Sequence, residues 1–477
     1  MIDVLVVGCG IIGTAAAYEL SRYNLKVKAI DRLNDIAGET TSANSGLIHA
    51  GFDPEPTTLM ARLNVRGSEL TRVLCEKLDI PYKQNGAFVL GFNKDDEAVI
   101  NKLYHNGVEN KIEGLEVISG DKAREMEPRL SKEAVCALSV PSAAVVSPWD
   151  FAVALAETAA RNGVKFSLHT EVTGISAING GYSVTTSNGE IQTKAIVNAA
   201  GLYADDVHGF LKKPDFKILP ARGQYYLLDK SAGNVVSRTI FQCPNKYGKG
   251  IMVTPTVHGN LLIGPSYDNV ELRSDVDTDP QTLEYVWQTA AKSIPGLNRR
   301  ENIRNFSGVR AISDVDDFII REANKGFFDL AGIKSPGLSS APAIAEELIS
   351  LMKTSGFKLS LKENFIDKRR VIRFRYADKL KRTEIIRENP AYGRIVCRCE
   401  SITEGEILDA FKSPIPPTTV DGIKRRCHAG MGRCQGGFCS PRIIDLISKH
   451  YHISPKAVLK DYDGSYIITG IKGEETS

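Results

Sequence analysis

The sequence predicts an α/β protein, α+β overall, in which a Rossmann-like dinucleotide-binding domain is joined to an antiparallel-sheet domain. A small helical domain with four paired cysteines follows. Three observations predict this class. The chain opens with a strand, a glycine-rich turn, a helix and a second strand. Short alternating segments fill about residues 210–325, and five of the nine cysteines fall within residues 397–439.

The composition is that of a globular protein. The 477 residues include 60 Lys+Arg and 57 Asp+Glu, and this near balance excludes a general nucleic-acid or membrane-surface binder. No apolar run reaches the roughly 18 residues of a membrane helix, and Asp3 stands where an export signal would carry positive charge. We therefore expect a cytoplasmic protein that binds no nucleic acid, has no membrane span, and meets a membrane only through a partner.

The first thirty-one residues form a βαβ unit. Val4–Val7 and Val27–Ile30 are apolar and flank a helix rich in alanine. In the turn between them, Gly8 permits a tight bend, Gly10 lets a pyrophosphate approach the backbone, and Gly13 allows close helix–strand packing. Asp31, eighteen residues after Gly13, is placed to accept a hydrogen bond from a ribose hydroxyl. The unit predicts a dinucleotide site and leaves the dinucleotide open.

The middle of the chain contributes further parts of this layer. Residues 148–162 have helical spacing and end before Gly163. Tyr182–Thr186 and an Asn-Gly turn predict a hairpin that leads into a buried strand over residues 195–201. The small residues at the end of this strand, including Gly201, would let a cofactor lie close.

Segments that alternate as in an antiparallel sheet follow, over residues 223–228, 250–253 and 260–263. They predict a separate layer that covers the substrate. Residues 327–332 are expected to form a return strand, and a glycine turn then leads into a helix over residues 343–352. Pro342 is expected at an early position of this helix.

Residues 362–394 carry eleven Lys/Arg and five Asp/Glu without a clear apolar period. We expect a basic linker over residues 356–392, which contains most of this stretch. A solvated connecting face is the favoured interpretation of its charge, and a docking strip for an acidic partner is the alternative.

The cysteines of the C-terminal region carry the strongest chemical signal. Cys397 and Cys399 form one close pair, and Cys434 and Cys439 form another. Four thiolates can hold zinc or an iron–sulfur cluster. The C-x-C spacing, the nearby glycines and Arg398, Arg425, Arg426 and Arg433 favour a [2Fe-2S] cluster over zinc, with a disulfide pair less favoured still. Cys427 is a fifth thiol whose favoured interpretation is a bystander.

Several motifs together resemble one enzyme superfamily. They are the opening glycine turn and residues 39–51, 222–225, 307–310 and 332–342. The chain resembles the FAD-dependent D-amino-acid-oxidase-like superfamily. Within it, the chain is similar to the bacterial glycerol-3-phosphate dehydrogenase A-subunit type, which carries a domain like bacterioferritin-associated ferredoxin. L-2-hydroxyglutarate dehydrogenases share the pattern over residues 44–51, so the substrate stays open.

The resemblance implies FAD at the opening glycine turn, and residue chemistry agrees at the last helix, whose free N–H groups would face the flavin pyrimidine edge. The expected cofactor-binding residues are Gly8, Gly10, Ile11, Ile12, Gly13, Asp31, Thr40, Thr41, Ser42, Ser45, Gly46, Gly201, Gly332, Gly337, Leu338 and Ser339.

Oxidising a secondary alcohol requires a group that takes the hydroxyl proton, and an anionic substrate requires a cation. His49 is the candidate base, because imidazole titrates near neutral pH, with a structural or flavin-contacting role as the alternative. Arg310 is the candidate clamp, and Arg222 is expected to share it. The alternative for Arg310 is an ion pair with Asp314, Asp316 or Asp317.

The resulting hypothesis is a dehydrogenase that oxidises sn-glycerol 3-phosphate to dihydroxyacetone phosphate. A tethered cluster implies electron transfer to a partner, which in the resembling family is a second flavoprotein or a quinone-linked subunit. The alternatives are an L-2-hydroxyglutarate or other 2-hydroxy-acid dehydrogenase, and a flavoenzyme with a structural zinc interaction module. We expect the oxidoreductase domain over 1–355, with FAD-binding parts at about 1–50, 141–210 and 325–355 and substrate parts at about 51–140 and 211–324. The cluster domain is expected over 393–450, with an extension over 451–477.

Overall fold

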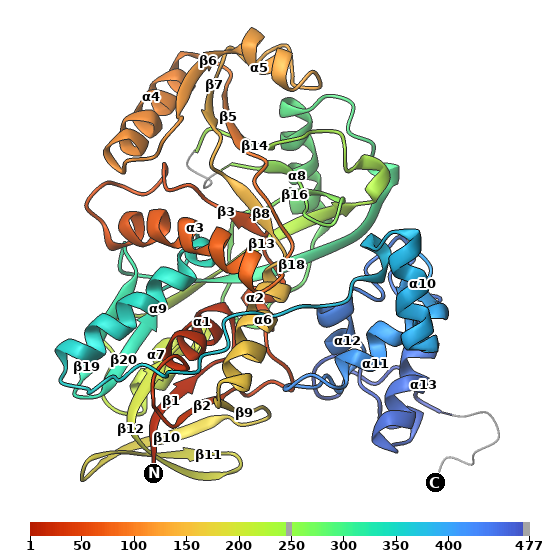
Figure 1. Ribbon diagram of the computed structural model, residues 1–477. Coiled ribbons are helices and arrows are strands. Elements are labelled where there is room, and N and C mark those ends of the chain that lie inside the picture. Colours follow the sequence, from red (N-terminus) through yellow and green to blue (C-terminus); the bar gives the residue numbers. More distant parts are fainter. Residues whose placement is uncertain (245–249, 471–477) are drawn as a thin grey trace.

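Two sheets, one below the other in Figure 1, and a helical C-terminal domain beside them make up the structure. It is a computed structural model that describes residues 1–244 and 250–470. The end of the expected extension, 471–477, lies outside the described residues. Within the described ranges, no helix has the length and apolar character that crossing a membrane requires.

The lower sheet is the dinucleotide-binding layer. Its central strand β1 pairs in parallel with β2 on one side and β12 on the other, and β12 also pairs in parallel with β20. The strand order is β10-β11-β12-β1-β2-β9; β20 also pairs with β12, and β19 pairs with β20. The strands are β1 (Ile2–Val7), β2 (Val27–Ile30), β9 (Lys165–Ser167), β10 (Val172–Ile178), β11 (Gly181–Thr186), β12 (Gly189–Asn198), β19 (Ile319–Asn324) and β20 (Phe327–Ala331).

Alternation along β1 determines what covers each face of this sheet. Val4 and Val6 belong to the same core as three helices, α1 (Ile11–Leu20), α6 (Pro148–Arg161) and α9 (Gly337–Thr354). Leu5 and Val7 belong to another core, which they share with the β10–β11 hairpin and helix α7 (Ala204–Gly209). The fold class expected from the sequence is confirmed.

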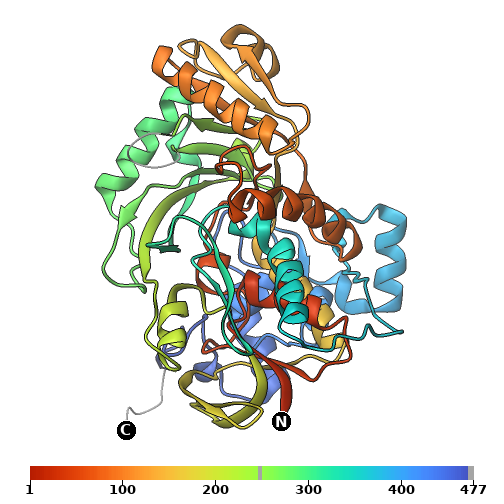
Figure 2. The same cartoon turned by 90° about the vertical axis from the view of Figure 1, so that its left-hand side faces the viewer.

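The upper sheet has nine strands, mostly antiparallel, and its longest pair is β13 with β18. One face packs on α8, which is green in Figure 2, and the other face packs on α4. Its strands are β5 (Ala87–Gly91), β6 (Glu116–Ser119), β7 (Cys136–Val140), β13 (Ile218–Leu228), β14 (Thr239–Gln242), β15 (Met252–Pro255), β16 (Leu261–Gly264), β17 (Asp268–Asn269) and β18 (Asn302–Ser313).

Short elements connect the two sheets. A three-stranded sheet has β8 at its centre, and α3 packs against α9. The remaining elements of this region are α2 (Glu39–Ser42), α3 (Leu59–Lys77), α4 (Lys94–Glu109), α5 (Gly120–Met126), α8 (Pro280–Ser293), β3 (Leu47–Ile48), β4 (Tyr82–Lys83) and β8 (Ala144–Val146).

Helix α9 begins earlier than expected. It starts at Gly337, so Pro342 lies inside the helix and not in its first turn. A proline at this position cannot donate to the carbonyl of Leu338. The small residues before Pro342 are therefore the first turn of the helix itself.

The expected linker contains a helix and is not only a solvated face. Helix α10 (Lys379–Glu388) buries Ile385, and Asp378 caps it by accepting from the Lys381 N–H. Earlier in the segment, Arg369 is buried and its Nε donates to Glu157 at 2.7 Å. A buried arginine requires such a partner. This charged residue therefore binds the linker to helix α6, which contains Glu157.

The C-terminal domain has a small core of its own. Ile407, Ile423, Ile443 and Ile447 are buried in it beside Cys397 and Cys439. Its elements are β21 (Ile395–Cys397), β22 (Ile402–Thr403), α11 (Glu404–Ala410), α12 (Val420–Cys427) and α13 (Ser440–Tyr451). Figure 1 shows the domain, in blue, beside the lower sheet and next to α6.

Buried ion pairs join this domain to the lower sheet. Asp35 is buried, and both nitrogens of the Arg426 guanidinium fork donate to it at 2.9 Å. Arg425 donates to Asp35 at 3.0 Å and to Asp461 at 2.7 Å. Arg425 and Arg426, which the sequence suggested as counter-charges for a cluster, therefore bind acids at the domain interface.

Candidate functional site

A cavity of about 1000 Å³ lies where the first βα turn, the N-terminus of α9 and the upper sheet meet. Both sheets contribute to its walls, so the two layers make one site. Of the residues expected from the sequence, those that line the cavity are Gly10, Ile11, Ile12, Thr40, Thr41, Ser45, His49, Gly201, Arg310, Gly332, Gly337 and Leu338.

The glycine turn packs too closely for other residues. Gly8 has a φ of +101°, and a Cβ there would lie 2.4 Å from the Ala199 carbonyl oxygen. A Cβ on Gly13 would lie 1.9 Å from the Gly8 carbonyl oxygen. Thr41 Oγ1 accepts from the Ile11 N–H at 3.0 Å, which ties α2 to the start of α1. The turn thus brings bare backbone to the cavity wall.

Asp31 lies at the end of β2 and organises the same turn. Its two carboxylate oxygens accept from the Cys9 N–H at 2.6 Å and from the Leu33 N–H at 2.9 Å. Burial raises its pKa to about 6. At neutral pH the carboxylate is still mostly ionised, and each oxygen retains a lone pair for a further donor.

His49 and Arg310 reach the cavity from different elements. His49 follows β3; its backbone N–H donates to Ser339 Oγ at 2.8 Å, and its Nε2 lies 3.2 Å from Ser335 Oγ. Arg310, on β18, donates to the Ser266 carbonyl at 3.0 Å and lies over the Tyr267 ring. The structure therefore brings the candidate base and the candidate clamp to one cavity.

Gly223 makes room for the Arg310 guanidinium. A Cβ on Gly223 would lie 2.2 Å from Arg310 Nη2. The three aspartates considered as alternative partners of Arg310 are bound elsewhere. Asp314 accepts from the Lys217 N–H, Asp316 pairs with Lys334, and Asp317 accepts from the first N–H groups of α3.

Arg222 lies on the other face of the same sheet. In the β13–β18 pairing, Arg310 stands opposite Ala221, and Arg222 stands opposite Val309. Successive strand residues point to opposite faces, so Arg222 and Arg310 point apart. Arg222 Nη1 donates to Asp275 at 2.7 Å. The structure does not bring Arg222 into a shared clamp.

The remaining expected residues lie behind the cavity wall. Ser339 accepts from His49, as described above. Gly46 donates its N–H to the Asn44 side chain at 2.8 Å, and Ser42 donates to the Glu39 carbonyl at 2.9 Å. These bonds shape the loop between α2 and β3 and so position the lining residues.

The four cysteines fall into two pairs that differ in exposure. Cys397 and Cys439 are buried and hydrogen-bonded to each other. Cys399 is exposed, and its sulfur lies 3.6 Å from that of Cys434. Each pair takes one cysteine from the C-x-C segment and one from the second segment. An inner pair and an outer pair suit a cluster with two iron atoms.

Backbone N–H groups point at these sulfurs. Those of Gly430 and Glu400 bond to Cys397, and those of Phe438 and Gly436 bond to Cys434. The bond from Cys439, with these donors, lowers the pKa of Cys397 to about 6. Cys427 differs, since its thiol donates to the Ile423 carbonyl at 3.3 Å and burial raises its pKa to about 12.

Comparison with known proteins agrees with this geometry. Residues 3–351 match the FAD dependent oxidoreductase family. The chain belongs to the FAD-dependent oxidoreductase family. Residues 395–449 match the BFD-like [2Fe-2S] binding domain, so this oxidoreductase carries a second redox module.

Three similar proteins illustrate the relationship. A glycerol 3-phosphate dehydrogenase from Caloramator mitchellensis is 45% identical, with 98% of each chain covered. The structure of the FAD-bound L-α-glycerophosphate oxidase from Mycoplasma pneumoniae superimposes with a TM-score of 0.73 at 34% identity, covering 77% of this chain and 98% of that chain. A mitochondrial L-2-hydroxyglutarate dehydrogenase from Arabidopsis thaliana is 28% identical, covering 73% of this chain and 82% of that protein.

The residues present fit both cofactors of this FAD-dependent oxidoreductase. The bare backbone at Gly8–Gly13 and the acceptor at Asp31 suit a dinucleotide, and the cavity is large enough for a flavin and a small substrate. The paired sulfurs with their N–H donors suit a [2Fe-2S] cluster.

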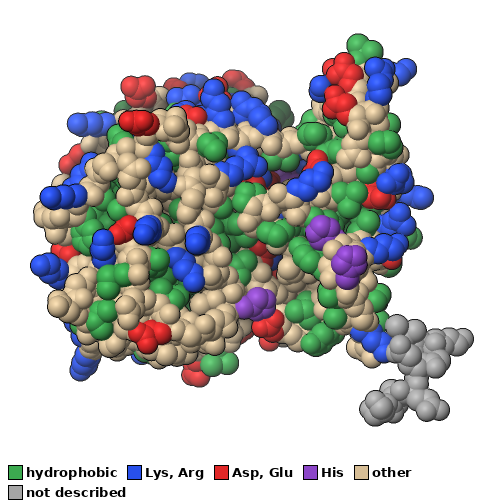
Figure 3. All heavy atoms as spheres, turned by 60° about the horizontal axis from the view of Figure 1, so that its bottom comes forward, with side chains coloured by type: hydrophobic (Ala, Val, Ile, Leu, Met, Phe, Trp, Pro, Cys, Tyr) green, Lys and Arg blue, Asp and Glu red, His purple; other side chains and the backbone are tan. Residues whose placement is uncertain are grey.

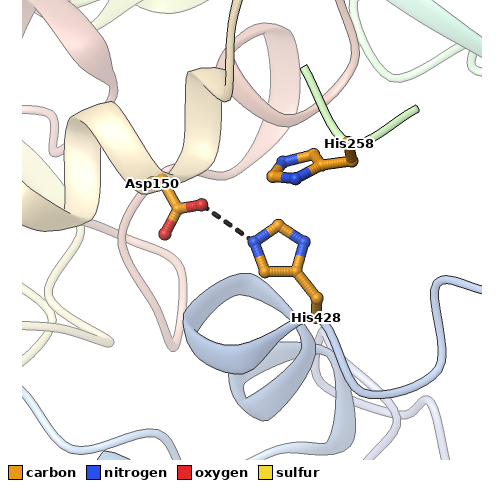
Figure 4. A group of neighbouring side chains, drawn as sticks. All are labelled: Asp150, His258 and His428. Carbon is orange, nitrogen blue, oxygen red and sulfur yellow. Dashed lines mark hydrogen bonds and ion pairs between the residues drawn. The ribbon is translucent and has the colours of Figure 1, made fainter. Parts of the chain in front are cut away.

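A buried junction connects the two redox modules (Figure 4). Asp150, in the first turn of α6, accepts from His428 at 2.9 Å, and the ring of His258 lies 4.0 Å from the ring of His428. Trp149 stacks on His258. The ligand atoms lie close enough for a metal ion, but Arg375 Nη2 lies 3.5 Å from His258 Nδ1, and a fixed positive charge there disfavours a cation.

Ionisation at the junction follows from its burial. Burial and the neighbouring His428 hold the pKa of His258 well below its ordinary value, so this imidazole is neutral at physiological pH. Burial opposes ionisation of Asp150, but the His428 partner outweighs it and keeps the pKa of Asp150 below its ordinary range. The junction therefore holds a buried anion, Asp150, near a neutral imidazole, His258.

Two residues of the cavity had no assigned role from the sequence alone. Lys334 lies in the turn before α9, lines the cavity and pairs with Asp316 at 2.9 Å. Tyr267 lines the wall beside Arg310. In the sequence, Lys334 could have been singled out as a cation inside a glycine- and proline-rich turn. No sequence feature points to Tyr267, because its position depends on how β17 pairs with β13.

Proposed function

We propose that this FAD-dependent oxidoreductase is a dehydrogenase that converts sn-glycerol 3-phosphate to dihydroxyacetone phosphate. What supports the substrate is the pairing of a fixed guanidinium, Arg310, with an imidazole, His49, in one cavity that also contains the glycine turn. Similarity to glycerol 3-phosphate enzymes over nearly the whole chain agrees with it. FAD, when bound, accepts the hydride from the C2 carbon of the substrate.

Side chains of the cavity bind the substrate and accept its hydroxyl proton. Arg310 binds the phosphate oxygens, since the bond to Ser266 occupies only part of its donor fork. Lys334 also lines the cavity, where its ammonium group pairs with Asp316. His49 Nε2 takes the C2 hydroxyl proton, so that the C2–O bond becomes a carbonyl as the hydride leaves. The His49 backbone N–H donates to Ser339 Oγ, and His49 Nε2 lies 3.2 Å from Ser335 Oγ; these two contacts position the imidazole.

We further propose that the electrons leave through the [2Fe-2S] module to a partner that accepts one electron at a time. Reoxidation by oxygen would not require such a module. Each substrate molecule yields two electrons, so two successive one-electron transfers restore the enzyme. A second flavoprotein or a quinone-linked subunit would meet this requirement.

The test is an anaerobic titration with sn-glycerol 3-phosphate followed by the visible spectrum. We expect the flavin bands to bleach near one equivalent of substrate, with partial loss of the cluster bands. If L-2-hydroxyglutarate bleaches the flavin and glycerol 3-phosphate does not, the substrate proposal is wrong.

A matched variant separates the two redox modules. Cys434→Ser removes an outer sulfur and should abolish the cluster absorbance and the iron and acid-labile sulfide content, while the substrate still reduces the flavin. Cys427→Ser is the control and should keep the cluster. Zinc without sulfide in the wild-type protein would contradict the relay.

A further inference from the structure

The four cysteine sulfurs differ in solvent exposure, so the cluster site has a buried side and an exposed side. The buried pair, Cys397 and Cys439, lies in the core of the C-terminal domain. Gly430, which donates to Cys397, follows His428 by two residues, and His428 binds Asp150 of the flavin domain. The inner pair therefore lies on the side of the junction, whereas in the outer pair Cys399 is exposed and Cys434 is half-buried.

A hydrophobic side chain stands beside the outer pair. Phe438 is 87% exposed, the most exposed of the large apolar side chains in the described part of the chain. Its own N–H bonds to the Cys434 sulfur, so the backbone of this residue is fixed while its ring projects into water. Exposing a phenyl ring at a redox centre costs hydrophobic free energy, which a partner surface would recover.

Two arginines stand beside the outer cysteines in the sequence. Arg398 is exposed between the two cysteines of the C-x-C segment. Arg433, directly before Cys434, is 65% exposed and pairs with Asp229 at 3.4 Å and with Glu301 at 3.8 Å, so the unpaired charge beside the outer pair comes from Arg398. Farther out, Arg394 and Arg442 share the single carboxylate of Glu404, which leaves one positive charge in excess. Figure 3 shows Lys and Arg side chains on the C-terminal lobe, with acidic side chains among them.

We propose that the cluster rim, formed by Arg398, Cys399, Arg433, Cys434 and Phe438, is the docking surface for a one-electron acceptor protein with acidic groups around its own redox centre. This inference rests on the proposed function. An apolar contact encircled by complementary charge is the arrangement that brings two redox proteins together rapidly and lets them separate again. One electron passes from the reduced module to the acceptor in each encounter.

The test uses two haem proteins of opposite charge as acceptors, acidic cytochrome b5 and basic cytochrome c. The holoenzyme is reduced with sn-glycerol 3-phosphate without oxygen, and reduction of ferric to ferrous haem is followed by stopped flow. We expect cytochrome b5 to be reduced with the larger second-order rate constant at low salt, and this constant to fall as ionic strength rises.

Substitutions in the cluster rim test whether the acceptor docks on this surface. Phe438→Ser and Arg398→Glu should each lower the rate constant for cytochrome b5 by about tenfold, with substrate bleaching of the flavin unchanged. Leu272→Ser and Arg129→Glu remove an exposed apolar and an exposed basic side chain of the upper layer and serve as matched controls. Iron, sulfide and the visible spectrum show that each variant retains its cluster; if Phe438→Ser loses it, Arg398→Glu carries the test alone.

The outcomes are distinct. If the rim variants reduce cytochrome b5 as fast as the wild type does, or if cytochrome c is preferred at low salt, the docking surface is wrong although the relay stands. If sn-glycerol 3-phosphate leaves the flavin oxidised, the proposed function itself fails, and dithionite-reduced enzyme then tests the rim separately.

Discussion

One buried carboxylate, Asp35, binds two arginines across the interface between the flavin domain and the C-terminal domain, and Asp35→Asn tests its contribution. The substitution keeps the size of the side chain and removes its charge. Arg426 loses its carboxylate partner and keeps only the carbonyls of Gly422 and Ile415 as acceptors, whereas Arg425 retains Asp461. Arg426 is buried too, so an uncompensated cation is left in a low-dielectric interface.

The magnitude follows from the carboxylate's ionisation. Burial opposes the charge of Asp35, but Arg426 and Arg425 outweigh it and lower the pKa from 3.8 to about 2. This difference corresponds to roughly 2 kcal/mol of stabilisation. Removing one partner of a buried ion pair typically costs about 3–5 kcal/mol. We therefore expect Asp35→Asn to weaken the docking of the domain by about 2–5 kcal/mol.

Trp149 provides the readout, because its ring contacts both histidines of the junction. In a Trp287→Phe background it is the single tryptophan. Urea unfolding followed by its fluorescence should shift to clearly lower urea in Asp35→Asn. The control is Asp367→Asn, which breaks an exposed pair with Lys77 and should cost less than about 1 kcal/mol. Equal shifts in the two variants would refute the reasoning.

The pH dependence has a definite sign. Because the folded-state pKa of Asp35 is lowered, its stabilisation is fully present above the unfolded value of about 4 and is lost as the pH falls through about 2. Asp35→Asn should therefore differ most from the wild type at neutral pH and converge with it in strong acid. A constant difference between pH 7 and pH 2 would contradict this assignment.

Two further predictions concern the cavity. Gly13→Ala places a Cβ 1.9 Å from the Gly8 carbonyl oxygen and should abolish FAD retention, measured as flavin absorbance per chain. The control is Gly174→Ala, whose Cβ would lie 3.7 Å from its nearest neighbour, and this variant should retain FAD. Full FAD occupancy in Gly13→Ala would contradict the close approach. Arg310→Gln should raise the KM for sn-glycerol 3-phosphate by about 10- to 100-fold with FAD still bound, and Arg222→Gln should change it far less, because Arg222 points to the other face; an equal rise in both would show that the face assignment is wrong.

Much of the first layer could be predicted because its signals are local. The spacing of Gly8, Gly10 and Gly13 and the acid after the second strand are features of one contiguous segment, and strand alternation needs only near neighbours. The start of α9 was misjudged because a proline is usually a first-turn residue. Here the chain tolerates it one turn later, inside the helix.

The parts that could not be predicted depend on register or on distant contacts. Arg222 and Arg310 look equivalent in the sequence, and only the pairing of β13 with β18 shows that they point apart. Asp35 and Arg426 are separated by 391 positions, and Asp150 and His428 by 278. No periodicity or motif links residues at such separations, so the interface and its junction become visible only in three dimensions.

The buried pairing at Asp35 bears on how the mature protein is assembled. Arg425, Arg426 and His428 join the C-terminal domain to the flavin domain, and none of them is a candidate cluster ligand. We therefore expect a newly made polypeptide to dock this domain before any metal arrives. Iron and sulfide can enter later from the open side at Cys399, and a centre damaged by oxidants can be rebuilt there without unfolding the enzyme.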